Sequence, residues 1–255
     1  MKRKSALYGL LAALFWLLVW QGIAMLVGKP FLLPSPVETA GRLLSLLVTA
    51  DFYATAGMSL FRILIGYVLG VAAGVLLALL TTRFFWAEQL LRPLRSVIRA
   101  TPVSSIILLT LVWLTTGTVP VFIVFLMVLP IIWSNVETGI RQTDPLLLEM
   151  AKSFRLSRGR TLRRIYLPSV LPHFMDACIT ALGFAWKSGI AAEVLATPQL
   201  SIGTQLYESK IYLETPDLFA WTALVVILSF LLEKVLVRAL RSLSDHSKAK
   251  KEAAA

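Results

Sequence analysis

Long runs of apolar residues are the feature that most constrains this chain. They lie at about residues 5–27, 58–81, 98–116, 119–137, 172–196 and 217–240. A helix needs about 20 residues to cross the hydrocarbon core of a bilayer. Backbone groups cannot stay unpaired in lipid, and the runs lack the alternation of β-barrel strands. We therefore predict an all-α polytopic membrane protein with six transmembrane helices.

Composition agrees with a membrane protein. Only 15% of the residues are charged, against roughly a quarter in soluble domains, and the mean hydropathy is +0.77. The first apolar run, from Ala6 to Val27, is too long for a signal-peptide h-region of about 7–15 residues. We interpret it as a retained first helix. The single cysteine, Cys178, excludes an internal disulfide and a multi-cysteine metal site.

The basic residues predict the orientation of these helices. With the N-terminus inside, 20 of the 25 Lys and Arg residues lie on the inner side and three on the outer side. Cytoplasmic loops carry such an excess, so we predict that both termini are cytoplasmic. The net charge of +11 then reflects membrane topology, and we expect no nucleic-acid partner.

This topology divides the chain into segments of different character. They are an N-terminal transmembrane helix at 1–28, an extracytoplasmic segment at 29–57, a transmembrane core at 58–240 with a cytoplasmic loop at 138–171, and a basic cytoplasmic tail at 241–255. We expect the tail to be disordered.

The cytoplasmic loop contains a strongly basic stretch, EMAKSFRLSRGRTLRRIYLP, at 149–168. Asp144 and Pro145 before it predict a helix start, with Asp144 as N-cap and Pro145 at the first helical position. One apolar face then recurs at helical spacing, formed by Leu147, Met150, Ala151 and Phe154. From the residues alone, the arginines either contact anionic lipid or flank a docking helix.

The spacing in this loop resembles the EAA loop of ABC-importer permeases. That pattern reads EAA, three residues, Gly, nine residues and then I-x-L-P, and it is matched here by Glu149, Ala151, Ile165, Leu167 and Pro168. Met150 replaces the first Ala, and Arg155 stands where the family has Gly. Glycine ends a helix in the left-handed region without Cβ strain. The turn therefore has two candidate positions, Arg155 itself or Gly159 one turn later.

Other segments resemble the nitrate, sulfonate and taurine branch of this family. They are LPSP at 33–36, SLFR at 59–62, Ala185-Trp186 and AEVL at 192–195. The similarity covers about residues 30–240 and implies the type I ABC-importer permease fold.

The resemblance also implies a function. A permease of this kind lies in the bacterial cytoplasmic (inner) membrane and imports a small solute, here a sulfonate-, nitrate- or taurine-like anion or a vitamin precursor. It pairs with a second permease subunit, which would be a second copy or a paralogue, with two ABC ATPase subunits and with an extracytoplasmic substrate-binding protein. The outer docking surface would be 28–57 and 197–216. The implied ATPase-coupling residues are Glu149, Met150, Ala151, Phe154, Arg155, Ser157, Gly159, Ile165, Leu167 and Pro168.

The fifth apolar run carries a polar stripe. Its residues recur at three- and four-residue steps and are His173, Asp176, Thr180, Gly183 and Lys187. Such a stripe is costly against lipid, so we expect it to face the bundle interior or a translocation pathway. The candidate pathway residues are Asp176, Thr180, Gly183, Lys187 and Glu193. Lys187 then needs a partner, which is a carboxylate such as Glu193, backbone carbonyls or an anionic substrate. Arg62, near the outer end of the second run, is expected to snorkel to the interface.

Three glycines in the second run, Gly66, Gly70 and Gly74, recur every four residues. Small residues at this spacing allow close helix packing, either within one subunit or between subunits. The sequence contains no HExxH, GxSxG or Walker-type motif, so we expect no catalytic residue, cofactor or metal, and ATP hydrolysis by a partner.

Two rivals remain. A vitamin-binding membrane component of an energy-coupling-factor-type transporter would lack a long EAA-type loop. An intramembrane enzyme or channel would need polar residues that converge from several helices, whereas only the fifth run shows a polar stripe.

Overall fold

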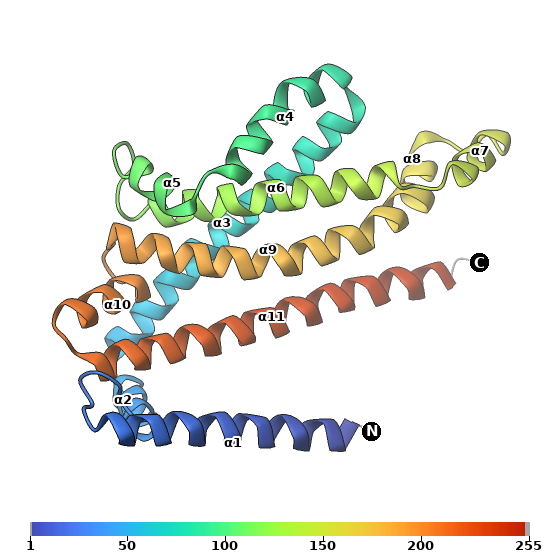
Figure 1. The fold of residues 1–255 in the computed structure, drawn as a ribbon. Helices are drawn as coiled ribbons and strands as arrows, with labels where there is room; N and C mark the ends of the chain where they lie inside the picture. The colour runs from blue at the N-terminus through green and yellow to red at the C-terminus, as the bar shows by residue number, and fades with distance from the viewer. Residues whose placement is uncertain (1, 253–255) are drawn as a thin grey trace. The chain divides into compact units, whose positions relative to one another are not determined.

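The computed structural model describes the backbone of residues 2–252 and the side chains of residues 8–240 and 242. Every regular element in this part of the chain is a helix, which confirms the all-α prediction (Figure 1). The elements are α1 (Lys2–Val27), α2 (Pro36–Leu46), α3 (Ala50–Arg83), α4 (Phe85–Ala100), α5 (Val103–Thr110), α6 (Val119–Arg141), α7 (Pro145–Ser153), α8 (Arg158–Thr161), the π-helical turn η1 (Leu162–Tyr166), α9 (Leu167–Ala196), α10 (Ile202–Ile211) and α11 (Thr215–Glu252).

Among the described residues, four helices are long and apolar enough to cross a membrane. They are Tyr8–Val27 in α1, Ala50–Arg83 (α3), Val119–Arg141 (α6) and the continuous helix Arg158–Ala196. The predicted third span at 98–116 is wrong as a single helix, because α4 ends at Ala100 and α5 covers only Val103–Thr110. Pro102 disfavours helical geometry at the residue before it, and Thr101 is accordingly extended, with ψ of 129°.

The predicted sixth span at 217–240 lies within α11. This helix continues to Glu252, and 253–255, the end of the predicted tail, lie outside the described residues. Neither Gly nor Pro occurs between residues 217 and 252, and Ala, Leu, Lys and Arg, all strong helix formers, are frequent there.

The chain divides into two compact units. The first comprises Met1–Ser59 with Thr197–Leu228, and the second comprises Leu60–Ala196 with Ser229–Ala255. Helices α3 and α11 contribute to both units. All the predicted coupling and pathway residues lie in the second unit.

Within the first unit, polar contacts join the predicted extracytoplasmic segment to the start of α11. Arg42 donates two hydrogen bonds to the Asp217 carboxylate, one of them from Nη2 to Oδ2 at 2.7 Å. These bonds raise the pKa of the Arg42 guanidinium above its ordinary value. Thr215 Oγ1 donates to the carbonyl of Phe31 at 2.6 Å. Segments that lie far apart in sequence are therefore held together here.

Within the second unit, α6 runs beside α9 and packs closely against α3 (Figure 1). A Cβ added at Gly66 would lie 2.5 Å from the carbonyl oxygen of Val121, and one at Gly70 would lie 2.7 Å from Cβ of Val128. At Gly74, one turn further along, an added Cβ would lie 2.8 Å from Cβ of Ile132. The three glycines thus form a contact surface for α6 within one subunit, at a helix separation that a larger residue would not permit.

This contact predicts that Gly70→Ala destabilises the protein by about 1–3 kcal/mol, because the added methyl group forces α3 and α6 apart. Gly57 lies on the same helix with open space around its Cα, so Gly57→Ala serves as the control. The control is expected to be neutral or up to about 1 kcal/mol stabilising. Thermal unfolding in detergent measures both, and equal midpoints for the two variants would contradict the close contact.

Candidate functional site

Helix α7 begins as its sequence predicts. Asp144 is the N-cap, and its Oδ1 accepts a hydrogen bond from the backbone N–H of Leu146 at 2.9 Å. Pro145 occupies the first helical position, where its missing N–H costs no hydrogen bond. The helix start is therefore fixed by local chemistry in this nine-residue segment.

The chain turns out of α7 at Arg155, the position where the EAA pattern has Gly. Arg155 adopts a left-handed conformation with φ of +48°. The N–H of Leu156 donates to the carbonyl of Ala151, and the N–H of Arg155 to that of Lys152, both at 2.9 Å. These two bonds define a Schellman motif. The alternative turn at Gly159 is wrong, since Gly159 lies inside α8 without a positive φ.

The predicted apolar face of α7 is largely open. Phe154 is 73% exposed and Met150 is 46% exposed, whereas Ala151 is buried. Glu149 is also exposed. Exposed apolar side chains that gather on one short helix, between basic flanks, indicate an interaction surface.

The segment that follows α7 is one continuous helix rather than a short connection. Ser157 begins α8, and its Oγ accepts a hydrogen bond from Arg160 Nε at 3.2 Å. In η1 the N–H of Leu167 reaches the carbonyl of Leu162, five residues back. Pro168 follows at once and would clash with a carbonyl four residues earlier, which favours the wider turn. Ile165 is buried, so it anchors this part of the helix.

The polar stripe on α9 lies on an open face of the subunit. Asp176, Thr180, Gly183 and Lys187 are all exposed. Glu193, the fifth candidate pathway residue, is fully buried. At about 100° per residue, Glu193 points roughly 100° away from the stripe. The structure thus brings four of the five predicted pathway residues together and separates the fifth.

Glu193 pairs with Arg62 instead. The Arg62 Nη1 to Glu193 Oε1 distance is 3.6 Å, and the Arg62 side chain is only 12% exposed. The prediction that Arg62 snorkels to the interface is therefore wrong. The prediction that Glu193 is the carboxylate partner of Lys187 is wrong as well. A buried carboxylate requires a nearby positive group, and α3 presents Arg62 to α9. Lys187 makes no ion pair within 4.0 Å among the described residues.

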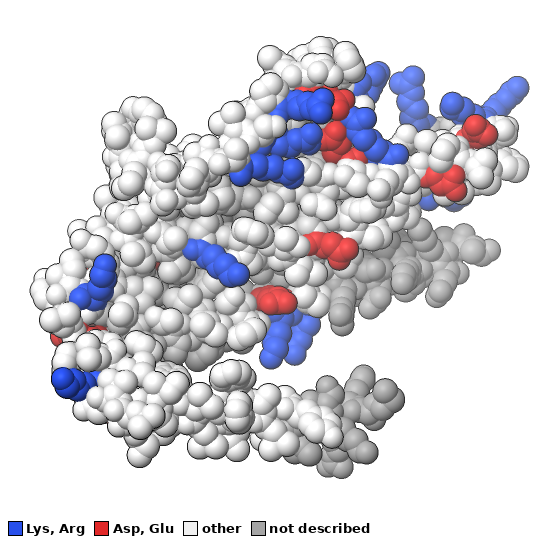
Figure 2. All heavy atoms as spheres, in the orientation of Figure 1, with Lys and Arg blue, Asp and Glu red and all other residues white. Residues whose placement is uncertain are grey.

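A cluster of charges between α4 and α6 was not predicted. Arg95 Nη1 lies 2.6 Å from Glu137 Oε2, and Arg141 Nη2 lies 2.8 Å from Glu88 Oε2 and 3.1 Å from Glu137 Oε1. We call these four residues the α4–α6 charge cluster. On the face seen in Figure 2, charged side chains gather around α4, the end of α6 and α7.

One signal in the sequence could have revealed this cluster. Glu88, Arg92, Arg95 and Arg99 recur at steps of four, three and four residues, which places them on one stripe of α4. The sequence alone does not show which helix this stripe faces. Glu137 lies within an apolar run, where a carboxylate is unusual and requires a positively charged partner.

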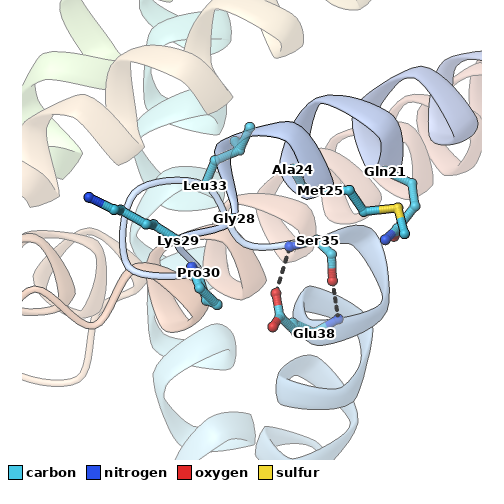
Figure 3. A pocket seen from close by; sticks show the side chains of 9 residues that line it. All are labelled: Gln21, Ala24, Met25, Gly28, Lys29, Pro30, Leu33, Ser35 and Glu38. Carbon is cyan, nitrogen blue, oxygen red and sulfur yellow. Dashed lines mark hydrogen bonds between the residues drawn. The ribbon is translucent and has the colours of Figure 1, made fainter.

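A cavity of about 240 Å³ lies in the first unit, between the end of α1 and the start of α2 (Figure 3). Ser35 and Glu38 form a capping box there, with bonds of 2.8 and 3.2 Å, and so begin α2. Lys29 points away from this pair (Figure 3). Ser35 and Glu38 thus serve the helix start, and none of the predicted coupling or pathway residues lines the cavity.

Residues 66–250 match the family described as "Binding-protein-dependent transport system inner membrane component", and the chain belongs to this family. A protein of Brucella melitensis named "Probable ABC transporter permease protein" is 28% identical over 216 residues, which are 84% of this chain and 87% of that one. The taurine transport system permease protein of Escherichia coli is 26% identical over 236 residues, which are 88% and 83% of the two chains. Other relatives are named for sulfonate and nitrate transport, which confirms the expected branch.

A solved structure supports the fold. The inward-facing MetNI methionine ABC transporter superimposes with a TM-score of 0.60 at 18% identity, and the match covers 79% of this chain and 97% of that one. At this identity the likeness shows the architecture of an ABC importer permease and nothing about its cargo.

The left-handed turn predicts that Arg155→Gly stabilises the end of α7 by about 1 kcal/mol, because it removes Cβ strain. Hydrogen–deuterium exchange of the amides of Arg155→Gly at positions 155 and 156 should slow about fivefold. Arg160→Gly lies in α8 at an ordinary φ and is the control, which should show equal or faster exchange. Unchanged protection in Arg155→Gly would show that the turn is not strained.

Proposed function

We propose that the chain is the transmembrane permease subunit of an ATP-driven ABC importer. The observation that carries this proposal is the exposed apolar face of α7, on a loop with EAA spacing, in a chain of the binding-protein-dependent transport family. An isolated permease subunit would have to leave such a face open until an ATPase covers it.

In this proposal α7 docks into a groove on a cytoplasmic ATPase. Met150 and Phe154 supply apolar contact area, and Arg155 and its basic neighbours set orientation. Movement of α7 then passes into the membrane through Arg158–Ala196, which is one continuous helix. The basic-residue asymmetry supports an orientation in the inner membrane with both termini cytoplasmic.

On the opposite side of the membrane, the segments 28–57 and 197–216 would receive a substrate-binding protein. The bonds from Arg42 to Asp217 and from Thr215 to Phe31 support a joint platform within the first unit. The segment 197–216 also contains three non-glycine residues with positive φ, namely Thr197, Leu200 and Leu213. Backbone strain of this kind is concentrated at functional surfaces.

The transported solute would pass along the open stripe of α9. A second copy of the chain would complete the pathway, and ATP binding and hydrolysis in two ATPases would drive alternating access. Lys187 lies nine residues before the end of α9, about 14 Å along the axis, which places it near mid-membrane. An exposed ammonium at this depth favours an anionic cargo, such as a sulfonate, nitrate or taurine-like solute.

The docking proposal predicts that Phe154→Asp weakens ATPase binding about 30-fold, as expected for loss of a central apolar contact. Tyr212→Asp is the control, since Tyr212 is 72% exposed but lies in the segment assigned to the outer side. Purification of each tagged variant in mild detergent from native membranes measures the recovered ATPase. Equal ATPase recovery with both variants would exclude α7 as the docking helix.

The pathway proposal predicts that Lys187→Met lowers uptake about tenfold, because an anion loses a charge-assisted contact. Uptake is measured in proteoliposomes with the anion that the co-purified binding protein carries. Lys234→Met, on α11, removes an exposed positive charge that does not belong to the α9 stripe, and it should keep wild-type uptake. Wild-type uptake by a well-folded Lys187→Met would rule out contact between Lys187 and the cargo.

A further inference from the structure

Helix α4 has its charged and apolar faces reversed relative to a soluble surface helix. Arg95 points toward α6, where its Nη1 lies 2.6 Å from Glu137 Oε2. Its guanidinium carbon Cζ lies 4.8 Å from the ring centroid of Trp133. Trp86 and Leu90, by contrast, are largely exposed. The charged stripe of α4 therefore attaches it to α6, while its apolar side is free to contact lipid.

Arg141 lies at the junction between α6 and the coupling segment. It is the last residue of α6, three positions before Asp144, the N-cap of α7. Its guanidinium contacts Glu88 of α4 at 2.8 Å and Glu137 of its own helix at 3.1 Å. The residue that leads into α7 thus also holds α4.

Further contacts make the attachment of α4 to α6 extensive. Arg99 Nη2 donates to Ser134 Oγ at 2.5 Å and to the carbonyl of Pro130 at 3.2 Å. Trp133, which lies under Arg95, donates from Nε1 to Thr81 Oγ1 of α3 at 3.0 Å. Because Glu137 is only 7% exposed, its bonds lie in a poorly solvated site where breaking one partner is costly.

We propose that Arg141 is a positioning residue that couples α7 to α4 through the α4–α6 charge cluster. This inference rests on the proposed function, in which an ATPase moves α7. Movement of α7 would displace the end of α6, and Arg141 would carry α4 along through Glu88. This route is separate from the one through α8, η1 and α9. Movement of α7 by the ATPase would therefore reach both α4 and α9.

A purely structural role for the cluster would give a different result. In that case its removal would lower stability and leave the response of α4 to ATP intact. The test therefore needs a readout at α4 itself, together with one at α7, in the assembled complex.

The experiment follows one spin label at a time in the permease–ATPase complex, reconstituted in lipid nanodiscs. The label is placed at Ser96→Cys on α4 or at Lys152→Cys on α7, both exposed positions. Cys178, the only native cysteine, is replaced by Ala in every variant. Spectra are recorded without nucleotide and after trapping with ATP and vanadate.

In the wild-type background, trapping should change the label spectrum at both positions. In Arg141→Gln the change at position 152 should persist, and the change at position 96 should fall about fivefold or more, as expected when a coupling contact is removed. Arg92→Gln is the matched control, because Arg92 lies on the same helix and makes none of the ion pairs in the described residues. Both changes should persist in that control.

Glu88→Gln provides a milder second variant, since Glu88 is partly exposed and its loss leaves the Glu137 contacts in place. If Arg141 acts through Glu88, the single variants and the double variant should lose the α4 response to a similar extent. An intact response at position 96 in Glu88→Gln and Arg141→Gln would overturn the inference. Absence of any response at position 152 in the wild-type background would instead overturn the proposed function.

Discussion

Close packing of α6 against α3 and α9 is the contact on which the rest of the second unit depends. Lipid tails are as apolar as the side chains, so the helices gain little from excluding lipid and must associate through tight contact. Glycines provide this contact along α3, and Gly189 does the same on α9, where an added Cβ would lie 2.6 Å from Ile63 Cγ1. The same region contains the pair of Arg62 and Glu193, which α3 and α9 bury between them. These contacts make α3, α6 and α9 a closely packed three-helix core, and this core positions α4 and α7 at its ends.

The elements at the ends of this core differ in how they are held. Helix α7 has its N-cap and its Schellman turn fixed by local bonds, yet its apolar face remains open. Helix α4 is held by ion pairs to α6 and keeps its apolar side exposed. The open stripe of α9, with Lys187, belongs to neither attachment. Each open surface thus matches a different proposed neighbour, namely an ATPase for α7, lipid for α4 and a solute pathway for α9.

Local features of this fold could be predicted from the sequence, because a few neighbouring residues determine them. The start of α7 at Asp144 is an example, and Arg155 was one of two candidate turn positions. The break at Thr101 differs from the prediction although Pro102 signals it, because the apolar run at 98–116 includes both residues. The partner of Glu193 and the α4–α6 charge cluster could not be predicted in the same way. Such pairs depend on which helix faces lie against each other, and periodicity within one helix does not contain that information.

In the proposed function, this chain is moved by an ATPase. The most direct measurement is the mass of the intact assembly, taken by native mass spectrometry after gentle extraction of the tagged chain from its own membranes. A complex of two copies of the chain with two copies of an ATPase is the predicted result. A folded chain recovered alone, under conditions that keep other ABC complexes intact, would contradict the claim.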